Sequence, residues 1–154
     1  MPRLSMYIAR HAAPDDLAVV GQLLHDFNTE FDDPTPGADW LTARVGDLLD
    51  DDDTSVIIAG EPPAAVAVVR YRKALWSDGQ EAYLSELYVV PQLRGQGIGT
   101  IVMEAVLVDA LERGTDDMSI GVDEIDHDAR RFYERLGFTN RSDDGLMFYY
   151  EKDL

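Results

Sequence analysis

Residues 83–100 read Tyr83-Leu-Ser-Glu-Leu-Tyr-Val-Val-Pro-Gln-Leu-Arg-Gly-Gln-Gly-Ile-Gly-Thr100, and this stretch decides how the chain folds. The segment 82–90 is rich in aromatic and β-branched residues and stops at a proline, which has no amide hydrogen to donate, so it predicts a buried strand. From Gly97, apolar residues recur at helical spacing as far as Arg113-Gly114, which predicts an amphipathic helix with a glycine stop. A glycine-rich turn therefore joins a strand to a helix.

The turn itself has the composition of an anion-binding site. A helix N-terminus exposes unpaired amide hydrogens and the positive end of the helix dipole. Glycines at positions 95, 97 and 99 let the backbone approach a pyrophosphate, so the amides of residues 95–100 can donate hydrogen bonds to its oxygens. Arg94 and the helix terminus also supply a local positive potential in an acidic chain. We therefore predict that the turn binds a phosphorylated ligand.

Two other phosphate-binding motifs do not fit this turn. The dinucleotide fingerprint needs a third glycine at a fixed distance, but counting from Gly95 that position is Thr100, and counting from Gly97 it is Val102. The nucleotide-triphosphate loop needs Gly-Lys-Ser/Thr, which occurs nowhere in the chain. On this motif alone, a glycine-rich turn without any ligand remains the alternative.

Length and composition limit the class of protein. A chain of 154 residues suits a single domain, which we expect to span residues 1–154. No apolar stretch is long enough for a membrane helix and no charged-then-apolar leader is present, so a cytoplasmic protein is expected. The chain has no cysteine, which excludes disulfides and thiolate metal sites.

The charge of the chain bears on its partners. Thirty acidic residues against thirteen basic ones give a formal charge of −17. Such a chain repels nucleic acid and anionic membranes, so neither is expected as a partner. The acidic excess either attracts a cationic substrate or forms a solvated surface adapted to solubility or salt.

Acidic and histidine residues do not predict a metal site. The run Asp50-Asp51-Asp52-Asp53 invites such an interpretation, but consecutive carboxylates on an irregular segment do not converge on one ion without other ligands. The three histidines, His11, His25 and His127, are scattered along the chain. We expect no metal.

Hydrophobic spacing predicts an α+β order of elements. A helix begins near Ala13-Pro14 and carries apolar residues as far as Phe27, and the segment 28–39 is expected to be a loop because it contains Pro34, Pro36 and Gly37. The other expected helices are 40–49, 97–113 and 128–136, and the expected strands are 5–10, 55–59, 64–71, 81–90, 118–122 and 145–151. The strands from 55 to 90 are expected to form an antiparallel meander.

A second stretch, Asp126-His-Asp-Ala-Arg-Arg-Phe-Tyr-Glu-Arg-Leu-Gly-Phe138, supports a family assignment. It resembles the GNAT N-acetyltransferase signature Asn-x-x-Ala-x-x-Phe/Leu-Tyr-Glu-x-x-Gly-Phe. The turn Arg94-Gly-Gln-Gly-Ile-Gly99 resembles the acetyl-CoA signature of the same superfamily, Arg/Gln-x-x-Gly-x-Gly/Ala. The two signatures cover roughly the C-terminal half of the chain, and the N-terminal half is compatible with the family.

The resemblance implies a fold and a donor site. The GNAT acyl-CoA N-acyltransferase fold has a central mixed, mostly antiparallel sheet flanked by helices. The implied co-substrate is acetyl-CoA, without a metal. One position departs from the family: its usual asparagine is Asp126 here, and a carboxylate accepts a hydrogen bond from a pantetheine amide but cannot donate one. The implied contacts to acetyl-CoA come from Leu87, Tyr88, Val89, Arg94, Gly95, Gln96, Gly97, Ile98, Gly99, Thr100 and Asp126.

The implied reaction, direct acetyl transfer to an amine, needs a base, an oxyanion donor and an acid. Between Tyr83 and Pro91, Glu86 is the only ionisable side chain besides the tyrosines, so we predict that it is the base, directly or through water. By strict alternation it shares a face with Leu84 and Tyr88, which leaves a solvent-facing role as the alternative. A backbone amide near Val89 is the expected oxyanion donor. Tyr133 aligns with the family's proton donor to the thiolate. The alternative is that Tyr133 is only an aromatic residue of the core.

The sequence is compatible with several classes of acceptor amine. Tyr83-Leu-Ser-Glu86 and the acidic composition resemble the polyamine (spermidine/spermine) acetyltransferase branch, in which Asp32 and Asp33 would hold a second ammonium group. Residues 27–36 also resemble aminoglycoside acetyltransferases. A protein or peptide amine is a further possibility, as is an acetyl-CoA-binding module without catalysis. A homodimer is expected from the family alone.

Overall fold

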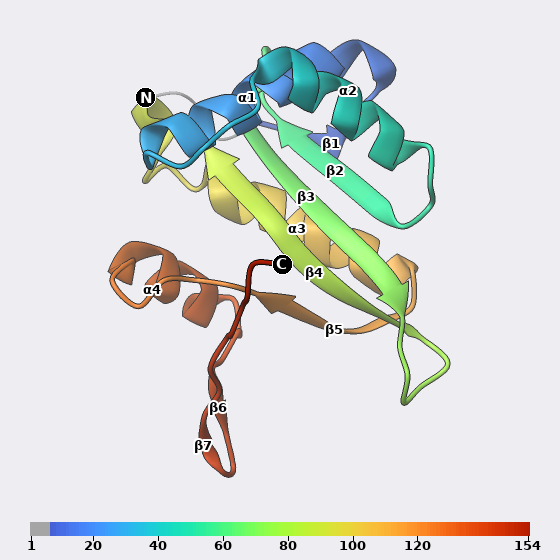
Figure 1. Ribbon diagram of the computed structural model, residues 1–154, viewed down its shortest axis with the longest axis vertical. Coiled ribbons are helices and arrows are strands. Elements are labelled where there is room, and N and C mark those ends of the chain that lie inside the picture. Colours follow the sequence, from blue (N-terminus) through green and yellow to red (C-terminus); the bar gives the residue numbers. More distant parts are fainter. Residues whose placement is uncertain (1–6) are drawn as a thin grey trace. The chain divides into compact units, whose positions relative to one another are not determined.

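A computed structural model describes residues 7–154, which divide into two compact units at Ser119 and Ile120 (Figure 1). The single domain expected for residues 1–154 stays a prediction. The first unit contains β1 (Ala9–His11), η2 (Pro14–Asp16), α1 (Leu17–Glu30), α2 (Ala38–Leu49), β2 (Thr54–Ala59), β3 (Ala65–Lys73), β4 (Gln80–Val89), η3 (Pro91–Leu93), α3 (Ile98–Glu112) and β5 (Thr115–Ile120), which ends at the boundary. The second contains α4 (His127–Arg135), β6 (Arg141–Ser142) and β7 (Gly145–Leu146).

The sheet of the first unit has the strand order β1-β2-β3-β4-β5. The first four strands pair antiparallel with their neighbours in sequence, which confirms the predicted meander. β5 starts beside β4, where the Gln80 amide donates to the Gly114 carbonyl at 3.1 Å, and the two strands then run in the same general direction and diverge (Figure 1). The sheet is therefore mixed and mostly antiparallel, as expected for an α+β protein.

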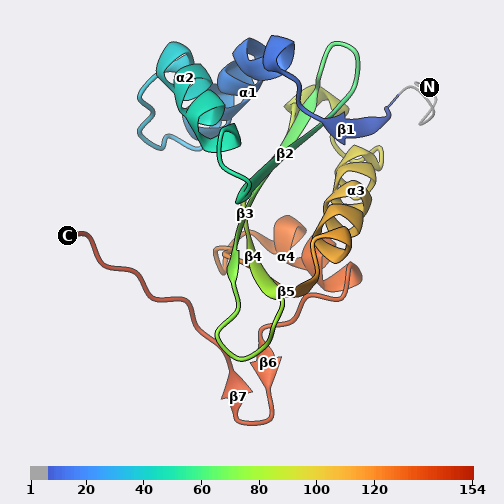
Figure 2. The ribbon, with the colours of Figure 1, turned by 90° about the vertical axis from the view of Figure 1, so that its right-hand side faces the viewer.

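Helices cover both faces of this sheet. α1 and α2 lie on one face and α3 lies on the other (Figure 2). The central strands β2 and β3 are buried on both sides, which explains why their sequences are nearly continuous runs of β-branched and small apolar residues. The core under α1 and α2 consists of Val20, Leu23, Leu24, Val45, Val56, Ile58, Val66, Val68 and Tyr88.

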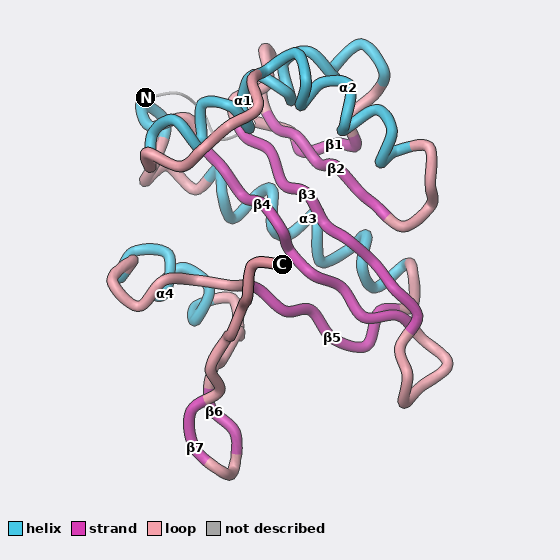
Figure 3. Tube along the Cα trace, viewed as in Figure 1, coloured by secondary structure: helices cyan, strands magenta, loops and turns pink. Residues whose placement is uncertain are grey.

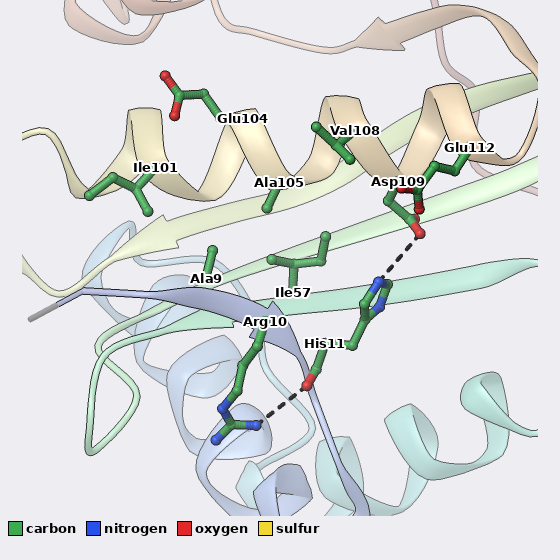
Figure 4. A pocket seen from close by; sticks show the side chains of 10 residues that line it. All are labelled: Ala9, Arg10, His11, Ile57, Ile101, Glu104, Ala105, Val108, Asp109 and Glu112. Atoms are coloured by element: carbon green, nitrogen blue, oxygen red, sulfur yellow. Dashed lines mark hydrogen bonds and ion pairs between the residues drawn. The ribbon is translucent and has the colours of Figure 1, made fainter. Parts of the chain in front are cut away.

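A buried carboxylate joins α3 to the sheet. Asp109, which is only 9% exposed, accepts hydrogen bonds from the Ser55 hydroxyl at 2.6 Å and the Tyr71 hydroxyl at 2.8 Å. The Arg113 guanidinium lies 3.3 Å from the same carboxylate, and the His11 ring lies 3.4 Å from its other oxygen (Figure 4). Burial alone would raise the pKa of Asp109, but the two hydroxyls and Arg113 together lower it below its ordinary value.

Replacing Asp109 by asparagine should therefore destabilise the fold. We expect a loss of about 1–3 kcal/mol in the free energy of unfolding at neutral pH, because two buried donors lose a charged acceptor. The folded pKa of Asp109 is lowered, so its carboxylate stabilises the fold fully above the unfolded pKa of about 3.9. This stabilisation disappears as the pH falls through the folded pKa. Urea unfolding of both proteins at pH 7 and at acidic pH should show the difference shrinking in acid. An equal difference in the free energy of unfolding at both pH values would contradict this expectation. The control is Asp51→Asn, because Asp51 is exposed.

Several predicted boundaries were wrong. α1 continues to Glu30, so the loop expected at 28–39 is only 31–37, because Phe31 and Asp33 still donate to the carbonyls of Phe27 and Asn28. The N-terminal strand is Ala9–His11, and the part of the expected strand at residues 5–6 lies outside the described residues. The strand expected at 118–122 occupies 115–120.

The last predicted strand, 145–151, was also wrong in extent. Only Gly145–Leu146 is a strand, paired with Arg141–Ser142, and residues 147–154 have no regular secondary structure (Figure 3). The continuous apolar and aromatic run at 146–150 favours a strand, but a strand forms only where a partner offers backbone groups. None of the helices described between residues 7 and 154 combines the length and the apolar character needed to cross a bilayer.

Candidate functional site

The glycine-rich turn has the backbone that the sequence predicts for an anion site. Gly95 has φ 74° and Gly97 has φ 85°, both in the left-handed region that side chains with a Cβ rarely adopt. Gly97 is the N-cap of α3, and no side chain caps this helix end. The first amides of α3, those of Ile98, Gly99 and Thr100, precede the first helical hydrogen bond, from Ile101 to Gly97. They are therefore available to an external acceptor.

Backbone and side chains have different roles in this turn. Ile98 buries its side chain in the core with 1% exposure, so only its amide is left to contact a ligand. Gln96 is partly buried and Thr100 is exposed. A Cβ built on Gly95 meets no atom within 4 Å, so open space lies beside that backbone. The predicted donor contacts of residues 95–100 therefore depend mainly on backbone amides.

The structure assigns Arg94 a partner that the sequence did not suggest. Its two terminal nitrogens donate to the carboxylate oxygens of Glu30 at 2.8 and 2.9 Å, and its Nε donates to the Val89 carbonyl at 2.9 Å. Its guanidinium also lies 5.4 Å from the centre of the Tyr88 ring. Arg94 was expected to supply positive charge to a phosphate, but here it is occupied by Glu30. Sequence reasoning missed Glu30 because it lies 64 residues away and no local pattern marks it.

A β-bulge changes the direction of Glu86. The pairing of β3 with β4 shifts between Val68 and Val69, so that Val68 faces Glu86 and Val69 faces Leu84, with Ser85 as the extra residue. The Ser85 hydroxyl donates to the Val68 carbonyl at 3.1 Å. Residues paired across a sheet point to the same face, so Glu86 and Leu84 point to opposite faces. The expected alternation from Leu84 to Glu86 was therefore wrong.

The bulge places Glu86 on the face of the sheet that carries α1 and α2. Tyr88 shares this face and packs on Phe27 of α1, with ring centres 5.1 Å apart. Glu86 itself is partly buried, and this burial raises the pKa of its carboxyl group. A carboxylate with a raised pKa is a stronger base than an exposed one, which suits it to accept a proton from an amine.

The end of β4 directs backbone groups away from β3. The Val90 amide donates to the Ala64 carbonyl at 2.9 Å, so the neighbouring pair, Ala65 and Val89, is of the type that does not exchange backbone hydrogen bonds. The Val89 amide therefore faces the β5 side, where the two strands diverge. Leu87 and Val89 are partly buried on the α3 face of the sheet, opposite Tyr88.

The second unit carries the other two predicted site residues. Asp126 is the N-cap of α4, and its side chain accepts a hydrogen bond from the Ala129 amide at 3.1 Å. Aspartate caps a helix as well as asparagine does, so the departure from the family preserves this local role. Tyr133 is partly buried between Phe132 and Phe138, with ring centres 5.2 and 5.7 Å away. The remaining predicted site residues all belong to β4, the turn and the start of α3.

One cavity, of about 370 Å³, lies between β1 and the later turns of α3 (Figure 4). Its lining includes Ile57 and the carboxylates Glu104, Asp109 and Glu112. These charges would repel the diphosphate of a coenzyme, so we do not assign the donor site there. Within residues 7–154, no group of histidine and acidic side chains is arranged to hold a metal ion.

A matched pair of glycines tests the turn. Gly95 and Gly114 both have φ 74°, and at both positions an added Cβ meets nothing within 4 Å. Alanine should therefore strain the backbone equally at each position, by about 1–2 kcal/mol. Only Gly95→Ala should weaken acetyl-CoA binding, by roughly tenfold, because its methyl group lies in the turn that approaches the diphosphate. Calorimetric titration measures this, and equal affinity of the two variants would contradict the assignment.

Comparisons with known proteins agree with this geometry. The model of the Acetyltransferase (GNAT) family matches residues 20–138. Thialysine N-epsilon-acetyltransferase of Mus musculus is 36% identical over 75 residues, covering 47% of this chain and 44% of that protein. A protein from Arthrobacter sp. FB24, solved and provisionally assigned as an acetyltransferase, has a TM-score of 0.88 and 46% identity over 96% of each chain.

A further solved structure shares the fold at low identity. An aminoglycoside acetyltransferase from an uncultured soil metagenomic sample, in complex with sisomicin, has a TM-score of 0.76 and 21% identity over 98% of this chain and 100% of its own. The chain spans less than half the length of the mouse relative. These similarities confirm the predicted GNAT fold, and the family match extends from α1 through the glycine-rich turn to α4. The chain belongs to the GNAT family of acetyltransferases.

Proposed function

We propose that this protein is an acetyl-CoA-dependent N-acetyltransferase that moves an acetyl group directly to a primary amine of a small cationic acceptor in a ternary complex. The observation that carries the proposal is the uncapped start of α3 behind two left-handed glycines, next to a strand that holds a partly buried Glu86. A helix start of this kind suits a diphosphate, and a carboxylate with a raised pKa suits the deprotonation of an amine.

The donor is proposed to bind along β4 and the turn. The amides of Gly97, Ile98, Gly99 and Thr100 would donate to the diphosphate, and partly buried Gln96 would lie beside it. Leu87, Tyr88 and Val89 would contact the pantetheine arm at the end of β4, and Asp126 would accept a hydrogen bond from one of its amides. Acetyl-CoA supplies the activated acetyl group.

Three groups of the chain are proposed to act in the reaction. Glu86 would accept the proton of the incoming ammonium group, directly or through a water molecule. The Val89 amide would donate to the oxygen that gathers charge when the nitrogen attacks the thioester carbonyl. Tyr133 would donate its hydroxyl proton to the departing thiolate, so that the free thiol leaves.

The acceptor is proposed to approach over the C-terminal end of α1. Phe27 and partly exposed Phe31 lie there with ring centres 5.5 Å apart, and the exposed carboxylates of Asp32 and Asp33 follow. Aromatic faces and carboxylates together favour ammonium groups. The mouse relative is named for transfer to an ε-nitrogen, which agrees with an alkylamine of the polyamine type. We propose a cytoplasmic protein, with a homodimer as its expected assembly and no nucleic-acid or membrane partner.

Replacing Asp32 and Asp33 by asparagine tests the acceptor class. We expect the KM for a diamine to rise about 5- to 10-fold, because each exposed carboxylate contributes at most about 1 kcal/mol to a second ammonium group. The KM for a monoamine of the same length should stay unchanged, since it has no second charge. An unaltered KM for the diamine would show that these residues do not bind it.

Two other functions are alternatives. Aminoglycosides are also polycations, and a structural neighbour of this chain is an aminoglycoside acetyltransferase bound to sisomicin. A module that binds acetyl-CoA without catalysis would retain the turn but would not need Glu86 or Tyr133. Release of free thiol that depends on both residues separates an enzyme from such a module.

The proposal is tested by measuring free CoA thiol over a panel of diamines, aminoglycosides, amino acids and peptides. The chain has no cysteine, so no protein thiol contributes to the signal. We expect release with at least one class of amine and the highest kcat/KM with a diamine. Acetyl-CoA binding without thiol release from any amine would favour the non-catalytic module, and no binding at all would exclude both.

A further inference from the structure

The pair Glu30–Arg94 connects two parts of the protein that are far apart in sequence. Glu30 is the last residue of α1, and Arg94 directly precedes the left-handed Gly95 of the turn. The pair is bidentate, at 2.8 and 2.9 Å, with side chains 28% and 41% exposed. Two parallel charge-assisted hydrogen bonds fix the guanidinium in orientation as well as in position.

Further contacts hold the same guanidinium. Its Nε donates to the Val89 carbonyl at 2.9 Å, and its plane lies near the Tyr88 ring. The Tyr88 hydroxyl in turn lies 3.5 Å from Glu30, and its ring packs on Phe27. The end of α1, the end of β4 and the start of the turn are therefore held together through one side chain.

The turn needs such a restraint. Its glycines have the widest choice of backbone conformations, and no side chain caps α3. A flexible loop loses this freedom when it binds a ligand, which weakens the affinity, and a contact that orders the loop beforehand reduces that loss. Arg94 anchors the residue at which the left-handed backbone begins.

We propose that Glu30 is a positioning residue for the donor site: by holding Arg94 it orders the glycine-rich turn before acetyl-CoA binds. The inference rests on the proposed function, and it makes donor affinity depend on the last turn of α1, next to the proposed acceptor surface. The competing arrangement has Arg94 leaving Glu30 to bind the diphosphate. The two arrangements predict opposite effects of removing the Glu30 charge.

The experiment compares Glu30→Gln, Arg94→Gln, Arg94→Lys and the double Gln variant by calorimetric titration with acetyl-CoA. We expect Glu30→Gln to weaken binding about fivefold, as loss of a bidentate pair of this exposure suggests. Arg94→Gln and Arg94→Lys should weaken it similarly, because lysine cannot reproduce the two-point contact. The double variant should bind no more weakly than the weaker single variant, since both changes remove one interaction.

A second readout separates positioning from a general loss of stability. The KM for acetyl-CoA should rise about fivefold in Glu30→Gln while kcat at saturating donor stays unchanged, because the reacting groups are untouched. Asp16→Asn is the matched control. It breaks a similar bidentate pair with Arg10, at 2.6 and 2.9 Å, far from the turn in sequence, and should leave the affinity unchanged whatever it does to Tm.

The outcomes are distinct. Tighter binding by Glu30→Gln, or normal binding by Arg94→Lys with weak binding by Arg94→Gln, would show that Arg94 binds the diphosphate and would overturn the inference. Normal affinity of both Gln variants would overturn it as well. If the wild type itself does not bind acetyl-CoA, the proposed function fails and the inference fails with it.

Discussion

Glu86→Gln is expected to lower kcat/KM by about 100- to 10,000-fold, the typical contribution of a general base. An alkylamine with a pKa of about 10.4 is neutral in only about one molecule in 2,500 at pH 7, so a positioned base has a large deficit to overcome. The amide of glutamine has the size of the carboxylate but accepts no proton at this pH. Affinity for acetyl-CoA should stay unchanged, because Glu86 is not among the proposed diphosphate contacts.

The pH dependence of the reaction identifies the role of Glu86 more sharply. The carboxyl group must be deprotonated to act, and burial raises its pKa, so wild-type kcat/KM should rise with pH through this raised value. The corresponding inflection should be absent from the residual activity of Glu86→Gln. Glu81→Gln is the control, since Glu81 lies on the same strand and pairs with Arg72. An unchanged profile in Glu86→Gln would show that Glu86 is not the base.

The same substitution should make the protein more stable at neutral pH. The folded pKa of Glu86 is raised, so folding favours the protonated form of its carboxyl group. Once the pH exceeds the unfolded pKa of about 4.3, the charged carboxylate therefore destabilises the folded state. Thermal unfolding should therefore show a higher Tm for Glu86→Gln than for the wild type at pH 7. The difference should vanish in acid. A lower Tm at pH 7 would indicate that the carboxylate is stabilised in the folded state.

Tyr133→Phe is expected to lower kcat by about 100-fold while affinity for acetyl-CoA stays unchanged. The thiolate leaves faster when a neighbouring hydroxyl donates a proton to it. Phenylalanine keeps the ring packed between Phe132 and Phe138 and removes only the donor. Single-turnover measurement of thiol release gives the rate of this step when chemistry is limiting.

The control for Tyr133 is Tyr150→Phe, because Tyr150 is 87% exposed in the same unit and has no proposed role. Its kcat should equal that of the wild type. Normal thiol release by Tyr133→Phe would mean that solvent protonates the thiolate and that Tyr133 is a packing residue. If Tyr133→Phe also lowers Tm by several degrees relative to the wild type, the loss of rate would point to lost packing.

Much of the fold was predictable because its signals are local. Periodicity identified α1, α2, α3 and α4, and β-branched runs identified β2, β3 and β4, since both patterns reflect which side chains must be buried. The helix boundary at Gly97 was found because a glycine turn before an apolar helix has a distinct composition. The prediction of the C-terminal strand was wrong because a local apolar run, here Leu146 to Tyr150, does not show whether a partner strand is available.

The sequence by itself determined the family, through two signatures that resemble those of GNAT acetyltransferases, and the family model matches residues 20–138. It also marked Glu86 as the one carboxylate on an otherwise apolar part of its strand. Only the tertiary structure decided where Glu86 points, because an extra residue at Ser85 reverses the alternation. It alone decided that Arg94 binds Glu30 and that Asp109 joins α3 to the sheet. These contacts connect residues 38 to 64 positions apart, and such distances are set by how the elements pack, which no local pattern encodes.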